Sequence, residues 1–88
     1  MFTVTWTQSA SDQLADAWMK TDSSMRDEIT KYVQKLDRHL RANADRIGES
    51  REPGVRILTN TPLGIEFQVS APDRLVTVVR AWGIRTRS

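Results

Sequence analysis

The second half of the chain is rich in arginine, whose side chain is suited to binding phosphate and carboxylate groups. From position 46 onward there is no lysine, and there are seven arginines: Arg46, Arg51, Arg56, Arg74, Arg80, Arg85 and Arg87. A guanidinium group presents a planar fork of donors that matches phosphate or carboxylate oxygens in pairs, which an ammonium group cannot do. Because this half has the pattern of strands, we expect several of the arginines to project from one sheet. The pattern indicates an anionic target: RNA, DNA or the acidic segment of a protein partner.

Glu66 is the best candidate for acid–base chemistry beside these arginines. RNA cleavage without a metal needs a base for the 2′-hydroxyl, an acid for the leaving oxygen, and positive charge to stabilise the phosphorane. Arginine supplies the charge, but it stays protonated at neutral pH and is a poor base. Glu66 lies with Gln68 on the polar face of a predicted strand, where a neighbouring Arg80 could hold it. The alternative for Glu66 is a cross-strand ion pair without catalytic function, worth under about 1 kcal/mol.

Other polar residues give weaker signals. Three further arginines fall in a predicted loop or in the C-terminal tail and are candidate phosphate contacts, with a solvated charge as the alternative: Arg51, Arg85 and Arg87. His39 is the only histidine, and we expect it to be solvated or to cap a helix. With no second histidine at helical spacing, no cysteine and no glycine-rich phosphate loop, the sequence predicts neither a metal site nor another cofactor.

Length and charge are those of one small soluble domain spanning residues 1–88. Residues 1–45 carry six basic and seven acidic side chains, a net charge of −1, whereas residues 46–88 carry seven and four, a net charge of +3. The excess of positive charge in the second half is smaller than that of the basic stripe on a dedicated DNA-binding domain. The N-terminus has neither the basic nor the apolar region of a signal peptide, and no apolar run could span a bilayer. We therefore expect a cytoplasmic protein without a membrane partner.

Hydrophobic periodicity predicts strands and helices in the order β-α-α-β-β-β. Residues 2–7 alternate as a half-buried strand, and a helix capped by Ser9 or Ser11 follows. Residues 21–24 break that helix and cap a second one, which reaches about Ala42. The remaining segments are a polar loop at 43–54 and strands at 55–58, 63–69 and 75–82. The pattern predicts an α+β fold, with a two-helix antiparallel hairpin on one face of a mainly antiparallel four-stranded sheet and the N-terminal strand beside the last strands.

The last predicted strand is interpreted as a central one, because both of its faces are partly apolar. Strict alternation places Arg80 on one face with Val78 and Trp82. An arginine on a central strand needs a partner. Trp82 has two interpretations: packing or contact with a protein partner, and stacking on a nucleic-acid base. Trp6 and Trp18 fit the apolar stripes and are predicted to be core residues.

Six short segments of the chain are similar to the corresponding segments of a known protein family. Phe2-Thr-Val-Thr-Trp6 with Ser9-Ala10-x-x-x-Leu14 opens the chain, and the second predicted helix ends in Leu36-x-x-x-Leu40-x-x-Asn43. Ile47-Gly48-Glu49-Ser50-Arg51 and Gly54-Val55-Arg56-Ile57-Leu58 follow, and Leu75-Val-Thr-Val-Val-Arg80-Ala-Trp82 forms the last strand. In these segments and in element order, the chain resembles the RelE/ParE superfamily of bacterial type II toxins. The likeness covers nearly the whole chain, and element order carries more of it than any single residue.

The resemblance implies a small toxin that a cognate antitoxin holds silent. RelE-like members cut messenger RNA on the ribosome, whereas ParE-like members act on DNA gyrase by protein contact. Arg56 and Arg80 match basic positions that RNA-cleaving members use. Those members commonly have a tyrosine, histidine or lysine near the C-terminus, and the tail after Trp82 has none of these.

Three functions are therefore open. The leading one is a RelE-like endoribonuclease that acts on mRNA at the ribosome and arrests translation, with Arg56, Arg80 and Glu66 as catalytic residues. The second is a ParE-like inhibitor of DNA gyrase without catalysis, and the third is a degenerate relative that only binds an antitoxin. In each case we expect an antitoxin segment across the apolar helix grooves or the open sheet edge, with acidic side chains near Arg80 or Arg85.

Overall fold

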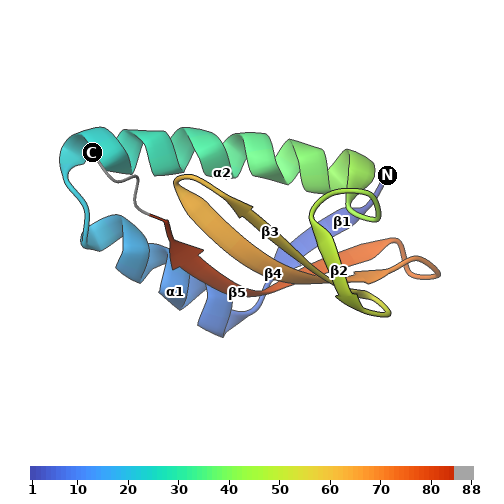
Figure 1. Ribbon diagram of the computed structural model, residues 1–88. Coiled ribbons are helices and arrows are strands. Elements are labelled where there is room, and N and C mark those ends of the chain that lie inside the picture. Colours follow the sequence, from blue (N-terminus) through green and yellow to red (C-terminus); the bar gives the residue numbers. More distant parts are fainter. Residues whose placement is uncertain (85–88) are drawn as a thin grey trace.

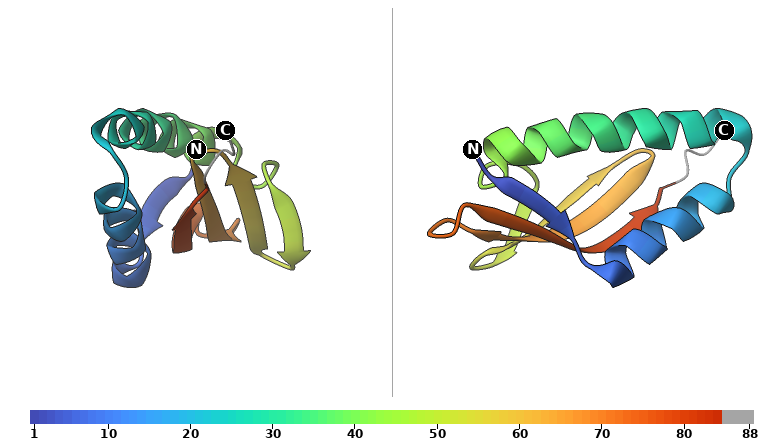
Figure 2. Two further views of the ribbon diagram at one scale, coloured as in Figure 1. Left: turned by 60° about the vertical axis from the view of Figure 1, so that its left-hand side comes forward. Right: turned by 180° about the vertical axis from the view of Figure 1, so that it is seen from behind.

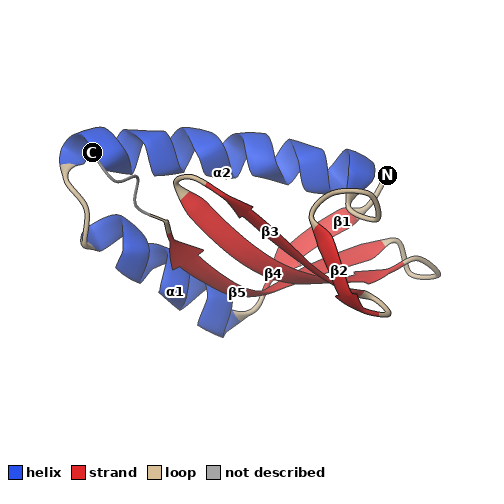
Figure 3. Ribbon diagram, in the orientation of Figure 1, coloured by secondary structure: helices blue, strands red, loops and turns tan. Residues whose placement is uncertain are grey.

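The computed structural model describes residues 1–84, which form two helices and five strands (Figure 1). The chain begins with β1 (Thr3–Trp6) and continues through α1 (Gln8–Met19) and α2 (Ser23–Asn43). The remaining strands are β2 (Glu49–Glu52), β3 (Val55–Asn60), β4 (Leu63–Ser70) and β5 (Leu75–Gly83). Figure 3 shows the helices and strands as two distinct groups, which confirms the predicted α+β class.

The five strands form one sheet in the order β1-β5-β4-β3-β2. Neighbouring strands are antiparallel except for β1 and β5, which run parallel from Thr3 opposite Leu75 to Trp6 opposite Val78. The N-terminal strand lies beside the last strand, as predicted, and β5 is an interior strand. The predicted four-stranded sheet is wrong, because the sheet has five strands and includes this parallel pair.

The strand that sequence reasoning missed is β2, which lies in the segment predicted as a polar loop. Its four residues are all exposed and none is apolar, so hydrophobic alternation cannot reveal it. Pairing with β3 orders it, with Glu49 opposite Ile57 and Ser50 opposite Arg56. Gly54 forms the intervening turn with a φ of 79°, which suits glycine. Charged side chains on this outermost strand discourage pairing with another chain.

α1 begins earlier than predicted, because its N-cap residue is Thr7 rather than Ser9 or Ser11. The Thr7 hydroxyl accepts a hydrogen bond from the Ala10 N–H at 3.0 Å, which satisfies one of the free donors of the first turn.

α2 begins where the sequence predicted a break between the helices. The carboxylate of Asp22 caps it by accepting a hydrogen bond from the Met25 N–H at 2.9 Å, and the helix ends at Asn43. Within residues 1–84, no helix combines the length and the apolar composition needed to cross a membrane.

Both helices lie on one side of the sheet (Figure 2), and the hydrophobic core lies between them and the sheet. α1 packs on β5, and α2 packs on α1 and β1. The buried core side chains come from both helices and from β4 and β5, and they include Ala10, Leu36, Leu40, Leu63, Ile65, Phe67, Val76, Val78 and Ala81. No described helix covers the opposite side of the sheet, which we call the open face.

Trp18 departs from its predicted core position, whereas Trp6 packs against the core as expected. The Trp18 side chain is 39% exposed, and the Arg26 guanidinium lies over its ring at 4.7 Å from the centroid. Arg26 also donates hydrogen bonds to the carbonyl oxygens of Trp18 and Met19, each at 3.0 Å. The start of α2 therefore satisfies the free carbonyl groups at the end of α1 and holds the two helices together.

Candidate functional site

A β-bulge in β5 decides which side chains reach the open face. Val78 lies opposite Phe67 and Arg80 lies opposite Glu66, so Val79 has no partner on β4. The extra residue inverts the alternation of side chains along β5. Val78 is buried on the helix side, whereas Arg80 lies on the open face. The prediction that the two share a face is therefore wrong.

Glu66 and Arg80 form an ion pair across β4 and β5, as the sequence suggested. The Nη2 atom of Arg80 lies 2.9 Å from Oε1 of Glu66. Arg80 is 56% exposed and Glu66 is 26% exposed, so solvent reaches both groups and screens their attraction. The pair therefore adds little stability, and it leaves a carboxylate and a cation side by side where a ligand can reach them.

Trp82 lies next to this ion pair, and Gly64 makes room for its ring. The two residues are opposite each other, and a Cβ atom at position 64 would lie 2.4 Å from Cε2 and 2.5 Å from Nε1 of the indole. The ring therefore packs directly on the glycine backbone. The Arg80 guanidinium carbon lies 5.3 Å from the centroid of this ring, within the range of a cation–π interaction. We call Glu66, Arg80 and Trp82 the open-face cluster.

Arg56 does not join the open-face cluster. It lies opposite the buried Phe67, so it projects on the helix side of the sheet. Its Nε atom donates to the carbonyl oxygen of Ile47 at 2.7 Å, and its Nη2 atom donates to that of Gly48 at 3.1 Å. Gly48 has a φ of 75° and lies against the β3 backbone. Arg56 thus anchors the loop between α2 and β2, and its partners are backbone carbonyls.

The other predicted phosphate contacts do not lie in the cluster either. Arg51 is exposed on β2, at the edge of the sheet, and the two strands β3 and β4 separate it from β5. Arg85 and Arg87 lie outside the described residues. Of the predicted site residues that the structure describes, only Glu66 and Arg80 are brought together. Sequence reasoning missed Gly64, although a glycine inside a strand is itself a sign that another group approaches the backbone closely.

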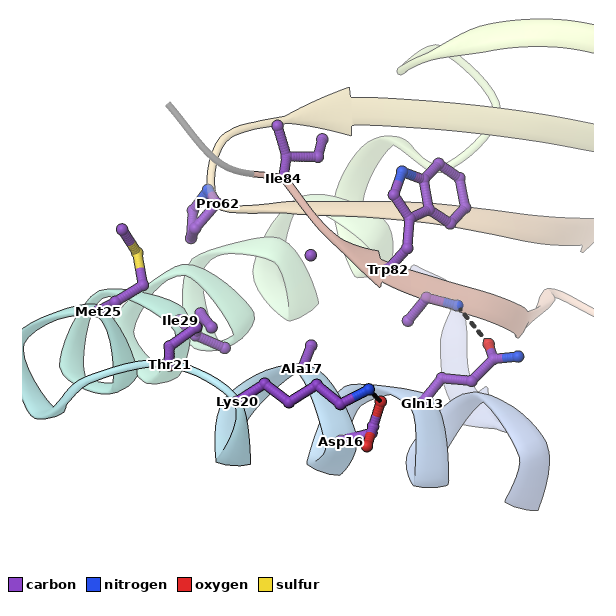
Figure 4. Close-up of a pocket in the computed structure, with 12 residues that line it drawn as sticks. Gln13, Asp16, Ala17, Lys20, Thr21, Met25, Ile29, Pro62, Trp82 and Ile84 are labelled. Carbon is purple, nitrogen blue, oxygen red and sulfur yellow. Dashed lines mark hydrogen bonds and ion pairs between the residues drawn. The ribbon is translucent and has the colours of Figure 1, made fainter. Parts of the chain in front are cut away.

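A cleft of about 350 Å³ lies between the end of α1, the start of α2 and the end of β5 (Figure 4). On its α1 side, Lys20 pairs with Asp16 at 2.8 Å, and the Gln13 side-chain oxygen accepts a hydrogen bond from the Ala81 N–H at 2.8 Å. The Gln13 contact ties α1 to β5 directly after the bulge. Figure 4 shows the Trp82 indole directed away from α1, toward the neighbouring strands.

An apolar groove runs between the two helices and reaches β1. It has a volume of about 590 Å³, and its apolar lining includes Trp6, Leu14, Trp18, Ile29 and Val33. No charged side chain lines it among the described residues. Such an uncharged groove between helices suits an apolar or amphipathic segment.

The described residues give no sign of a metal centre. Within residues 1–84, no three histidine, aspartate or glutamate side chains gather closely enough to hold a metal ion.

The comparisons with known proteins depend on structure, because no protein-family model and no curated protein matches the sequence. The fold is similar to a chain of the chromosomal ParDE toxin–antitoxin system from P. aeruginosa, with a TM-score of 0.67 and 22% identity over 97% of this chain and 98% of that one. It is also similar to a chain of the RelBE2 toxin–antitoxin complex from Mycobacterium tuberculosis, with a TM-score of 0.71 and 16% identity over 94% of this chain and 91% of that one. The isolated E. coli RelE toxin gives a TM-score of 0.63 and 20% identity over 100% of this chain and 88% of that one.

The chain has the RelE/ParE toxin fold. The similarity extends over nearly the full length of this chain and of the solved ones. Both RelE and ParE systems are among the matches, so the RelE/ParE fold does not by itself select one activity. The choice depends on the side chains of this chain.

Proposed function

We propose that this protein is the toxin of a type II toxin–antitoxin system, and that it cleaves messenger RNA on the ribosome in the manner of RelE. The RelE/ParE fold supports the first part of the proposal. The Glu66–Arg80 pair supports the second part, because it sets a carboxylate beside a cation on a face that a nucleic acid can approach.

The proposed reaction uses the two residues in different roles. An incoming phosphate competes with Glu66 for the Arg80 guanidinium and leaves the carboxylate free to accept the proton of the 2′-hydroxyl. The 2′-oxygen then attacks the adjacent phosphorus, and the 5′-oxygen leaves with a proton from water. Arg80 stabilises the negative charge that develops on the phosphorane. Arg56 has no catalytic role in this proposal, because it lies on the other side of the sheet.

We place the antitoxin in the apolar groove between the helices. The exposed Trp18 and the half-buried Trp6 line that groove, and burying such side chains is the main source of binding energy at protein interfaces. An antitoxin helix with an apolar stripe matches the composition of the groove. Acidic antitoxin side chains near Arg80 would also mask the open-face cluster.

A ParE-like inhibitor of DNA gyrase is the second candidate, and the position of Arg56 favours it. The sequence predicted two arginines at one site, but loop carbonyls engage Arg56, and Arg80 remains at the open face. Arginine and tryptophan are the residue types that most often dominate protein–protein binding. Under this alternative, Arg80 and Trp82 contact a protein surface and catalyse nothing.

Induced expression of the full chain in bacteria tests the choice. Rapid arrest of translation with cut transcripts supports the endoribonuclease. Filamentation and DNA damage without cut transcripts support the gyrase inhibitor. Unimpaired growth supports a relative that only binds an antitoxin, and it contradicts both toxic activities.

A further inference from the structure

A small cavity on the helix side of the sheet gathers three titratable side chains of α2. Tyr32, Lys35 and His39 line it at spacings of three and four residues, which place them on one face of the helix. Asn60 of β3 lies across from them, and the apolar lining consists of Leu36, Ile47 and Leu58. The cavity has a volume of about 220 Å³. It lies apart from the open-face cluster, which is on the other side of the sheet.

The charge of this cavity distinguishes it from the other three described within residues 1–84. Lys35 and His39 are its ionisable nitrogen groups, and no carboxylate lines it. The cleft of Figure 4 contains both members of the Asp16–Lys20 pair, and the other two cavities have no charged lining residue. Lys35 forms none of the ion pairs found among the described residues. Its ammonium group is therefore available to an anion.

The neutral groups of the cavity add hydrogen-bond donors. Burial raises the pKa of the Tyr32 hydroxyl above its ordinary value of 10.0, against a smaller opposing effect of the Asn60 side chain. The hydroxyl therefore keeps its proton at neutral pH and can donate it. The Asn60 amide adds a further N–H donor. Ammonium, imidazole, hydroxyl and amide groups together match the several oxygens of a phosphate group.

The walls of the cavity are held in place without a ligand. Leu36 is 1% exposed and belongs to the core, so α2 is fixed at this point. Ile47, on the opposite wall, has its carbonyl oxygen bound by Arg56 Nε at 2.7 Å. The walls between which the donors lie are therefore in place before a ligand binds, while the side chains of Lys35, His39 and Asn60 are themselves exposed and within reach of an ion from solvent. This contact also gives Arg56 a structural role in the cavity.

We propose that this cavity is a binding site for one phosphate group of a nucleotide or an RNA, held by Lys35, His39, Tyr32 and Asn60. Drug-sized ligands occupy pockets of roughly 300–1,000 Å³, so this smaller cavity takes a phosphate and little more. The site does not depend on the proposed RNA cleavage, since none of its residues belongs to the open-face cluster.

Titration of the full-length chain with inorganic phosphate, followed by two-dimensional NMR at constant ionic strength with chloride as the reference anion, tests the site. The signals of Tyr32, Lys35, His39 and Asn60 should shift together and saturate. Lys35→Gln should weaken binding about tenfold, the effect of losing one charged contact. Lys31→Gln, which removes the same charge one turn earlier on α2, should leave binding unchanged. Circular dichroism confirms that both variants are folded.

Two further titrations identify the source of the phosphate. Adenosine monophosphate that binds as tightly as a short 5′-phosphorylated RNA indicates a free nucleotide. Tighter RNA binding that weakens steeply with salt, and that still requires Lys35, indicates a nucleic-acid contact. The absence of shifts at the four residues with tens of millimolar phosphate would overturn the proposal. So would equal weakening by the Lys31 and Lys35 variants, because it would show non-specific attraction to the helix.

Discussion

Gly64→Ala should displace the Trp82 indole from the sheet. The new Cβ atom would lie 2.4 Å from Cε2 and 2.6 Å from Cζ2 of the ring, whereas an ordinary contact begins at 3.4 Å. The ring must therefore move by at least about 1 Å (3.4 minus 2.4), and Gly64 itself is buried and cannot yield toward solvent. Overpacking of this kind costs roughly 1–3 kcal/mol, and the lower chain entropy of alanine in the unfolded state offsets about 0.4–1 kcal/mol.

We expect a net loss of about 1–2 kcal/mol in the free energy of unfolding of Gly64→Ala. For a domain of this size, that corresponds to a fall in Tm of about 4–16 °C. Thermal unfolding followed by circular dichroism measures the loss, and the indole N–H signal of Trp82 in an NMR spectrum reports the displacement. Gly83→Ala is the matched control, because its new Cβ atom meets only the Ala17 Cβ at an ordinary 3.6 Å. Its Tm should stay the same or rise slightly.

A double-mutant cycle separates this clash from a general effect of alanine in a strand. In a Trp82→Ala background the obstacle is gone, so Gly64→Ala should cost at least about 1 kcal/mol less than in the wild-type chain. An unchanged Tm and an unmoved Trp82 signal in Gly64→Ala would refute the proposed packing of the open-face cluster. A cycle with no coupling would refute it as well.

Three other substitutions or titrations test the account. Arg56→Ala should lower the free energy of unfolding, measured by urea denaturation, by about 1–3 kcal/mol, because the carbonyl groups of Ile47 and Gly48 lose their hydrogen-bond donors. A variant as stable as the wild type would contradict the anchoring role of Arg56. Thr7→Ala should cost about 1 kcal/mol of stability through loss of the α1 cap, and Thr7→Ser should restore it. Tyr32 is the only tyrosine, and its raised pKa means that the folded chain favours the protonated hydroxyl. The contribution of Tyr32 to stability is therefore complete below pH 10.0 and is lost as the pH rises through the pKa of the folded chain. Absorbance at the phenolate band during an alkaline titration checks this, and an ordinary pKa in the folded chain would contradict the burial of its hydroxyl.

The fold was largely predictable from the sequence, because two kinds of hydrophobic periodicity separate cleanly along the chain. The apolar stripe of α2 and the apolar alternation of β4 each mark the side that is buried. Such a pattern indicates both the type of element and the side that lies against the core. β2 could not be predicted in this way, since it buries nothing and is ordered only by hydrogen bonds to β3. The parallel pairing of β1 with β5 follows from long-range topology, which local patterns do not contain.

The candidate site was only half predictable, and the bulge at Val79 is the reason. Strict alternation along β5 predicted that Val78 and Arg80 share a face, but the unpaired Val79 reverses the side on which every later side chain lies, so Val78 is buried and Arg80 is on the open face. No residue type in this stretch announces the bulge. The contact between Glu66 and Arg80 could be predicted, because both residues fall in segments with the pattern of strands. The side of the sheet on which Arg56 lies depends on the register between β3 and β4, which the sequence alone does not determine.

The most direct test of the proposed function is mRNA cleavage by the purified chain in a cell-free translation reaction, read as cut sites on a labelled transcript. We expect ribosome-dependent cleavage by the wild-type chain and a loss of roughly 10²–10³-fold in Arg80→Ala, the usual effect of removing one donor that stabilises a transition state. Arg38→Ala, which removes an exposed arginine from α2, should cleave as the wild type does. Undiminished cleavage by a folded Arg80→Ala variant would contradict the catalytic role of Arg80, and an intact transcript after treatment with the wild-type chain would contradict the endoribonuclease activity itself.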